Sequence, residues 1–230
     1  MDQLLNTAKY SPVEIGFFGL AGAAWVVVYA AVIRGMLRNQ FVEIPFPAVV
    51  VNFGWEIVWG FFFRTDLGLL FAWGYRLWFF MDLFIVWQLF KHGYKQIPSP
   101  VLQRYFRPTL AALIATFTVA LYFFVRGGLD SPQGLVSGYF TTIVSSTTYL
   151  WLFHSQKNPK LFSETVVWMT VVAIGASGVF AMLALRAYPV AIAMCSATWV
   201  CNWIYVFSYY RMRRQVGAAP MQPAVAAGRA

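Results

Sequence analysis

Seven long apolar stretches constrain this chain more than any other feature of its sequence. They cover residues 13–33, 46–63, 69–90, 109–125, 135–153, 164–185 and 190–210. Several reach the roughly 20 residues that cross a bilayer as a helix, and none shows the strict alternation of a transmembrane strand. Only 11% of the residues are charged, whereas a soluble domain has about a quarter. The sequence therefore predicts an all-α integral membrane protein with a seven-transmembrane helix bundle.

Lysine and arginine side chains divide unequally between the two sides of the predicted bundle. Twelve fall after the first, third, fifth and seventh stretches, whereas four fall on the opposite side, namely Lys9, Arg64, Arg126 and Arg186. Because positively charged residues stay on the cytoplasmic side, this pattern predicts an outside N-terminus and a cytoplasmic C-terminus. The formal charge of +9 is thus explained by topology, and no nucleic-acid partner is expected.

The predicted domain organisation is simple. One seven-helix transmembrane domain covers residues 1–210, and a basic tail over residues 211–230 has a composition that predicts disorder. Residues 34–45 and 91–108 are predicted loops, the second because its prolines stop helices. No signal peptide is evident, since the first twelve residues are polar. The lipid bilayer is the expected environment, a plasma membrane for a bacterial source or an endoplasmic reticulum for a fungal one.

Two neighbouring apolar stretches contain side chains that lipid would reject. Glu56 lies near the middle of the second stretch, and Asn52 precedes it by one helical turn. The third stretch contains Arg76 and Asp82. A charged group in hydrocarbon costs several kcal/mol unless it is neutralised, paired or facing a wet cavity. These four residues are therefore candidates for a functional site.

The predicted orientation allows the depths of the polar side chains to be compared, at 1.5 Å of helical rise per residue. Measured from the cytoplasmic ends of their stretches, Glu56 lies at about 15 Å and both Asp82 and Asn202 lie at about 12 Å. Asn52 lies at about 9 Å. Four polar side chains from three stretches thus share one layer, which predicts a common cavity that opens toward the cytoplasm.

The buried acids have both a functional and a structural interpretation. Burial favours the neutral form of a carboxyl group, so Glu56 can hold a proton ready for transfer as a general acid. The alternative is a protonated acid that only contributes a hydrogen bond to the bundle. Asp82 is either the partner of Glu56 or is paired with Arg76, although six helical residues place the latter two on different faces.

Tryptophan residues lie beside the candidate acids. Trp55 adjoins Glu56, Trp59 follows one turn later, and Trp78 precedes Asp82 by one turn. Most tryptophans in membrane helices pack or anchor at the interface. Aromatic faces also attract cations through the ring quadrupole. An acid among such rings therefore suits chemistry that passes through carbocations.

Two short motifs give the sequence a family resemblance. Asn-x-x-Trp-Glu in the second stretch (Asn52, Trp55, Glu56) and Trp-x-x-x-Asp in the third (Trp78, Asp82) resemble those of the membrane-integral terpene cyclases of meroterpenoid and indole-terpenoid biosynthesis. That family includes the paxilline- and pyripyropene-type cyclases and similar bacterial proteins. The resemblance implies an enzyme of secondary metabolism, a proton-initiated (class II-like) terpene cyclase that acts as an intramolecular lyase or isomerase.

The resemblance also implies a substrate and residue roles. The substrate would be a prenylated (farnesyl-type) aromatic or indole compound, which is protonated at an epoxide or alkene and closes into rings without diphosphate loss. Glu56 would donate the proton, with Asp82 as the second catalytic residue. The predicted substrate-binding residues are Asn52, Trp55, Trp59, Arg76, Trp78 and Asn202.

Asn202 departs from the family pattern. The last span of the family usually carries an essential acid near this position, and an asparagine cannot donate a proton as a carboxylic acid does. Two other functions fit the same polar layer. A seven-helix transporter would use it as a midplane site for a small solute or for protons. A scaffold or chaperone-like membrane protein would use it only to hold the bundle together.

No metal or cofactor is expected. His92 and His154 lack a ligand partner at helical spacing, and the sequence contains no aspartate-rich motif for magnesium and diphosphate. The expected partners are thus a prenylated small molecule and the lipid bilayer, and the sequence leaves the oligomeric state open.

Overall fold

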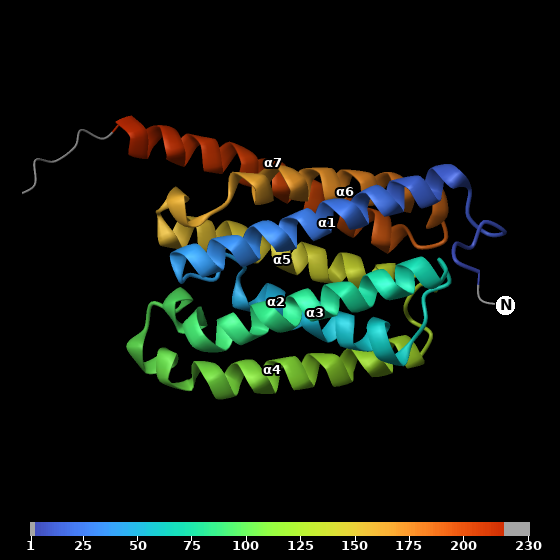
Figure 1. Ribbon diagram of the computed structural model, residues 1–230, viewed down its shortest axis with the longest axis horizontal. Helices are drawn as coiled ribbons and strands as arrows, with labels where there is room; N and C mark the ends of the chain where they lie inside the picture. The colour runs from blue at the N-terminus through green and yellow to red at the C-terminus, as the bar shows by residue number, and fades with distance from the viewer. Residues whose placement is uncertain (1–2, 219–230) are drawn as a thin grey trace, which may run out of the picture.

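Seven α-helices run alternately between two ends of an elongated bundle in the computed structural model, which describes residues 3–218 (Figure 1). They are α1 Pro12–Asn39, α2 Phe46–Ile57, α3 Leu69–His92, α4 Pro100–Arg126, α5 Leu135–Gln156, α6 Glu164–Ala184 and α7 Pro189–Ala218. Helix α2 continues as a π-helix over Val58–Phe62, and two 3₁₀ turns cover Gly93–Gln96 and Pro159–Leu161. Residues 3–218 contain no strand. The predicted all-α class is confirmed.

Five of the helices are long and apolar enough to cross a membrane by length and composition, namely α1, α3, α4, α6 and α7. Helix α2 and its π-helical continuation form a shorter apolar helix over Phe46–Phe62. Helix α5, which is rich in serine and threonine, is not among the five. Membrane crossing by all seven helices therefore stays a prediction, as does the direction in which the bundle is inserted.

Helix α1 is defined by local signals at both of its ends. The backbone N–H of Glu14 donates to the Ser11 hydroxyl at 3.3 Å, and the Ser11 N–H donates back to Glu14 Oε2 at 2.7 Å. This capping box satisfies two backbone donors at the helix start. Gln40 adopts a left-handed conformation, with φ 51°, and ends the helix. Residues 34–39 are thus helical, and the predicted loop over residues 34–45 is shorter than expected.

Two other predicted boundaries were wrong. Helix α4 begins at Pro100 and passes through Pro108, so much of the predicted loop over residues 91–108 is helical. A proline in the first helical turn loses no hydrogen bond, and one inside a helix removes only one, so neither ended this helix. Helix α7 continues past residue 210 to Ala218, which makes the start of the predicted disordered tail helical. Residues 219–230 of that tail lie outside the described residues.

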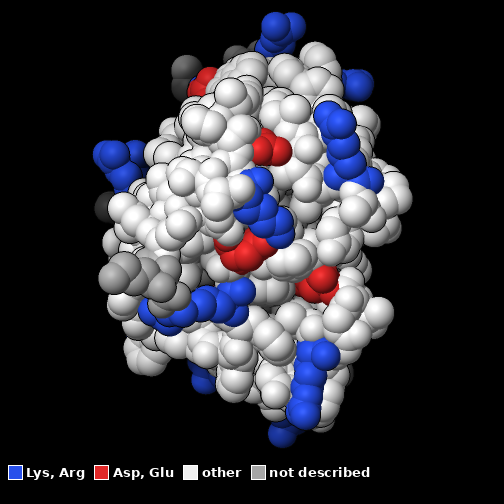
Figure 2. Space-filling model, turned by 90° about the vertical axis from the view of Figure 1, so that its right-hand side faces the viewer, with Lys and Arg blue, Asp and Glu red and all other residues white. Residues whose placement is uncertain are grey.

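The segment before α1 closes one end of the bundle. Asp66, in the connection before α3, accepts hydrogen bonds from Lys9 and from the Tyr10 hydroxyl. Gln133, in the connection before α5, donates to the same Tyr10 oxygen. Figure 2 looks at this end of the molecule, where acidic side chains lie between basic ones on a largely uncharged surface. These bonds join the N-terminal segment to the connections before α3 and α5, which are far apart in the sequence.

Helix α2 occupies the middle of the bundle. It packs against α3, α4 and α5, while α1 lies along α6, and α7 covers α5 and α6 (Figure 1). Eight of its twelve residues are buried, including Glu56. The helix at the centre of the bundle therefore carries Glu56, an acid that is unexpected in an apolar stretch.

We predict that replacing Gly134 by alanine will destabilise the protein more than the same change at Gly128. Both glycines have positive φ, 79° and 72°, where an alanine costs about 1–2 kcal/mol. A Cβ on Gly134 would also lie 2.6 Å from the Trp59 ring, whereas one on Gly128 would meet nothing within 4 Å. The added overlap should cost a further 1–3 kcal/mol or so. Thermal unfolding of both variants in one detergent measures the difference, and equal midpoints would contradict this packing.

Candidate active site

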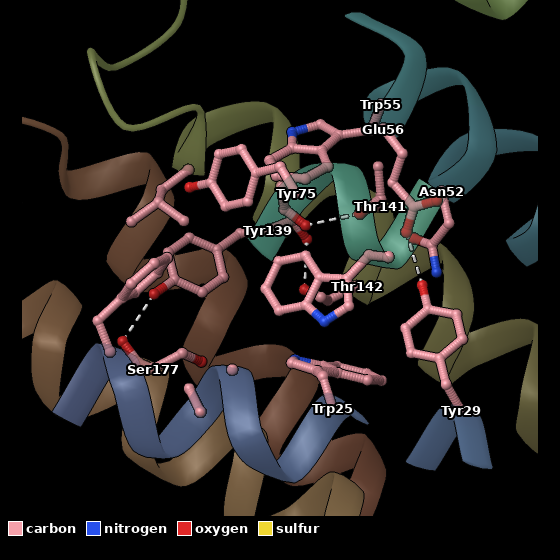
Figure 3. A pocket seen from close by; sticks show the side chains of 16 residues that line it. Trp25, Tyr29, Asn52, Trp55, Glu56, Tyr75, Tyr139, Thr141, Thr142 and Ser177 are labelled. Atoms are coloured by element: carbon pink, nitrogen blue, oxygen red, sulfur yellow. Dashed lines mark hydrogen bonds between the residues drawn. The ribbon is translucent and has the colours of Figure 1, made fainter. Parts of the chain in front are cut away.

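A cavity of about 90 Å³ lies at the centre of the bundle, between α1, α2, α3, α5 and α6 (Figure 3). Seven of its sixteen lining residues are aromatic, namely Phe18, Trp25, Tyr29, Trp55, Tyr75, Trp78 and Tyr139. The polar side chains on the wall include Asn52 and Glu56 of α2, which lie one turn apart and face the same space. The prediction that these two α2 residues share a cavity is therefore confirmed.

Glu56 lies in a group of three polar side chains from three helices. The Tyr29 hydroxyl of α1 donates to Glu56 Oε1 at 2.7 Å (Figure 3). The Asp82 carboxyl of α3 lies beside both Glu56 and Tyr29. Glu56 is 2% exposed and Asp82 is 1% exposed. The depth argument thus predicted correctly that these two acids lie at one level.

The acid pair has fewer hydrogen-bond donors than it needs. Glu56 Oε2 and Asp82 Oδ2 find no partner within residues 3–218, and no cation of the described chain pairs with either acid. Two adjacent buried carboxyl groups do not both ionise, because like charges repel strongly at low dielectric. The pair is therefore best described with at least one proton, which also supplies the missing donor. Asp82 itself is not part of the cavity wall.

The aromatic rings of the wall are fixed by hydrogen bonds at their polar ends. Trp55 Nε1–H and the Tyr75 hydroxyl donate to the backbone carbonyls of Gly134 and Gln133, at 3.0 and 2.9 Å. The Tyr139 hydroxyl donates to a carbonyl of α6 at 2.6 Å (Figure 3). Since these polar atoms are satisfied elsewhere, the rings can turn π-faces and edges toward the cavity. Such a wall attracts a cation without offering it a nucleophile.

Arg76 and Trp59 do not lie on the cavity wall. Arg76 Nε–H donates to the Gly60 carbonyl of the π-helix at 3.0 Å, and its guanidinium lies over the Trp73 ring. Of the two alternatives for Asp82, the structure therefore favours Glu56. Trp59 Nε1–H donates to Asp130 at 3.3 Å, in the connection before α5. The prediction that both residues bind substrate is not supported by their positions, because their polar atoms are bonded to the bundle.

Asn202 also lies away from the central cavity. It belongs to α7, which contributes no residue to the wall, and its Oδ1 accepts a hydrogen bond from Ser146 of α5 at 3.3 Å. The side chain is buried, and its amide nitrogen has no partner within residues 3–218. The prediction of one cavity shared by four polar residues was thus wrong for Asn202, and also for Asp82, which neighbours Glu56 without lining the cavity. Its depth is suitable, but it faces the α5–α7 contact.

Several residues of the site were missed by the sequence analysis. Tyr29, Trp25, Tyr75 and Tyr139 look like ordinary membrane aromatics, and none lies in the two motifs that indicated the site. The signal that could have identified Tyr29 is its position on one face of α1 with Trp25, four residues apart. The hydroxyl groups of Thr141 and Thr142 on α5 bond to carbonyls of their own helix.

Comparison with known proteins identifies the family. Residues 1–215 match the family described as Pyr4-like transmembrane terpene cyclases, so the chain belongs to this family of multi-pass membrane proteins. The chain is similar to terpene cyclase ascF of Acremonium egyptiacum, with 27% identity over 121 residues. That match covers 50% of this chain and 41% of the relative. No solved structure matches the chain. The family resemblance drawn from the two motifs is confirmed.

We predict that Tyr29 and Glu56 are energetically coupled. Tyr29→Phe removes the donor to Glu56 Oε1 and should cost about 1–3 kcal/mol, because a buried acceptor is left unsatisfied. In a Glu56→Gln background, the stability lost through Tyr29→Phe should differ from the loss in the wild type by roughly 0.5–3 kcal/mol, as expected for residues in one network. Thermal unfolding of the four proteins measures this coupling.

Tyr139→Phe provides the matched control for this cycle. Its hydroxyl also donates within the cavity wall, but to a backbone carbonyl of α6. The destabilisation by Tyr139→Phe should therefore simply add to that by Glu56→Gln. If the destabilisation by Tyr29→Phe also simply added to that by Glu56→Gln, the hydrogen bond from Tyr29 would not couple the two residues energetically.

Proposed function

We propose that this protein is an intramembrane cyclase that protonates an epoxide or alkene of a prenylated (farnesyl-type) aromatic or indole substrate. The carbocation would then be captured by the other double bonds of the prenyl chain, without loss of diphosphate. The observation that carries the proposal is the position of Glu56, an acid on the wall of an aromatic cavity, bonded by Tyr29 and beside Asp82. Membership of the cyclase family supports it.

The proposed reaction is an isomerisation in which protons balance. The Glu56 carboxyl donates its proton to the epoxide oxygen or to an alkene carbon, and positive charge develops on a neighbouring carbon. Ring closure moves this charge along the chain, and the last cation loses a proton. Substrate and product then have the same mass, and the net proton count is unchanged. Positioned proton transfer of this kind typically contributes a factor of 10²–10⁴ in rate.

Tyr29 and Asp82 support Glu56 in this proposal. A hydrogen bond from Tyr29 stabilises the carboxylate that Glu56 leaves after it donates the proton. Asp82 neighbours Glu56 but does not line the cavity, so it acts as a positioning residue that shares the proton of the pair. The predicted catalytic role of Asp82 is thus proposed here in an indirect form.

The cavity wall suits the intermediate. Trp55, Tyr75, Trp78 and Tyr139 present rings whose faces stabilise positive charge as it moves between carbons. Asn52 adds an amide near Glu56 that can orient a polar group of the substrate. The space of about 90 Å³ is below the roughly 300 Å³ of sites for drug-sized ligands, so the cavity must widen to admit a prenylated ring.

We infer that all seven helices cross the membrane, with the N-terminus outside and the C-terminus in the cytoplasm. The chain alternates between the two ends of the bundle (Figure 1). Within residues 3–218, eleven lysines and arginines belong to one end, against four at the other. Such an excess favours the cytoplasmic side. Helix α5 crosses in spite of its hydroxyl groups, because they bond to their own helix.

We predict that Glu56→Gln abolishes cyclisation. Glutamine keeps the shape of the side chain but has no acidic proton to donate. The measurement is liquid chromatography with mass spectrometry, after expression in a host supplied with farnesylated and epoxyfarnesylated aromatic or indole compounds. The wild type should give a peak of unchanged mass and altered retention. The variant should lose it by at least about 10²-fold.

Arg76→Gln is the matched control, since it also removes a charge from the bundle but lies outside the cavity. It should retain product formation. An active Glu56→Gln variant would rule out this acid as the proton donor. Movement of an unchanged solute across proteoliposomes, with no product from a broad panel, would favour the transporter instead.

We further predict that the reaction takes up solvent deuterium in a pattern that identifies the group protonated. In deuterated water, an alkene start places one deuterium on carbon, which persists after transfer to ordinary water. An epoxide start places it on the new hydroxyl, from which it exchanges away. Mass spectrometry before and after back-exchange distinguishes the two. Carbon-bound deuterium that also appears with the Glu56→Gln protein would show that the label does not come from this acid.

A further inference from the structure

A groove of about 960 Å³ lies on the outside of the bundle, at the end opposite the start of the chain. It is formed by the second half of α1, the connections before α2 and α6, and the last turns of α7. These segments lie together at the left-hand end of Figure 1. This groove is separate from the central cavity, with which it shares no lining residue.

The groove lies on the face of α1 that points away from the central cavity. Trp25 and Tyr29 project into the central cavity, whereas Val27, Arg34 and Arg38 line the groove on the opposite face of the same helix. The polarity of the groove changes along the helix axis, because its α1 wall is apolar as far as residue 31 and basic from residue 34. An apolar wall that ends in arginines matches a molecule with a hydrocarbon chain and an anionic head.

The cations at the groove exceed the anions available to them. Arg34, Arg38 and Lys160 form no ion pair within residues 3–218. Arg213, the fourth cation of the lining, is neutralised by Glu164. Arginine guanidinium groups bind phosphate in a bidentate manner, and basic pockets at the cytoplasmic side of membrane helices bind anionic lipid heads. The charge of the groove therefore favours a phosphate.

A buried carboxyl group forms part of the same groove. Glu43, in the connection between α1 and α2, is 1% exposed, and its Oε1 accepts a hydrogen bond from the Ser163 N–H at 2.8 Å. Its Oε2 has no partner within residues 3–218. Burial raises the pKa of Glu43 to about 7, although the Ser163 N–H and the nearby Tyr149 hydroxyl lower it, so the group can donate as well as accept at neutral pH. The Tyr149 hydroxyl of α5, itself unpartnered, lies near this carboxyl, so a ligand hydroxyl would join it there, beside the unpaired cations.

We propose that this groove binds one anionic phospholipid with a hydroxylated head, of the phosphatidylglycerol type. The phosphate lies among Arg34, Arg38 and Lys160, a head-group hydroxyl bonds to Glu43, and one acyl chain follows the apolar wall of α1 from Val27. The lipid would hold the ends of α1, α6 and α7 together. This inference is independent of the cyclase reaction, since no residue of the central cavity takes part.

The test is lipid binding by the full-length protein, measured by native mass spectrometry and by thermal unfolding in detergent with added lipid. One molecule of phosphatidylglycerol should remain bound and raise the unfolding temperature, whereas phosphatidylcholine with the same acyl chains should not. The Arg34→Gln/Arg38→Gln double variant should bind on the order of 30-fold more weakly, from about fivefold per arginine. The matched control is Arg211→Gln/Arg214→Gln, which removes two exposed arginines at the same end that do not line the groove.

Glu43→Gln tests the second contact. Phosphatidylmethanol has the same phosphate diester as phosphatidylglycerol but lacks the head-group hydroxyls. The wild type should prefer phosphatidylglycerol, and the Glu43→Gln variant should lose much of that preference while it still binds both lipids. Equal binding of phosphatidylcholine, equal loss in the two arginine variants, or equal stabilisation by inorganic phosphate alone would each overturn the proposal.

Discussion

The rest of this structure depends on the contact between two carboxylic acids at the centre of an apolar bundle. A bilayer offers no water to a buried polar group, so each one needs a partner within the protein. Tyr29 donates to Glu56, and Asp82 lies beside both, which requires α1, α2 and α3 to converge at one level. The short α2 helix is consequently surrounded by neighbours instead of facing lipid.

The need of each buried polar atom for a partner within the protein also explains how acidic and aromatic side chains share one cavity. The polar atoms of Trp55 and Tyr75 bond to the connection before α5, whose residues Gln133 and Gly134 lie at the end of the bundle closed by the N-terminal segment. The rings are therefore held firmly, and their π-systems remain available. A π-helix begins directly after the turn that carries Glu56, and such local widening is frequent at functional sites. Arg76 satisfies one of its carbonyls.

Sequence analysis predicted the helical class, the family and the level of the two acids, because apolar length and helical rise are one-dimensional properties. It could not predict which way a side chain faces around the helix axis, since this depends on neighbours chosen by tertiary packing. Asn202 and Arg76 have the right depth or sequence position but face other partners. Tyr29 was missed because a tyrosine in an apolar stretch has the same pattern whether it packs or donates to an acid. The loop predicted over residues 91–108 was too long because proline is tolerated at some helical positions, here those of Pro100 and Pro108.

The position of α7 bears on the departure at Asn202 from the family pattern. This helix packs on α5 and α6 and contributes nothing to the wall of the central cavity. Asn202 bonds to Ser146, and the next turn brings Tyr205 against Tyr149, so the residue belongs to a separate polar contact between α5 and α7. An acid there would have no direct access to the Glu56 pair in this arrangement. The asparagine therefore leaves Glu56 and Asp82, the proposed proton source, unaffected, and any influence of Asn202 on the cavity must pass through the packing of α5, which supplies Tyr139 to its wall.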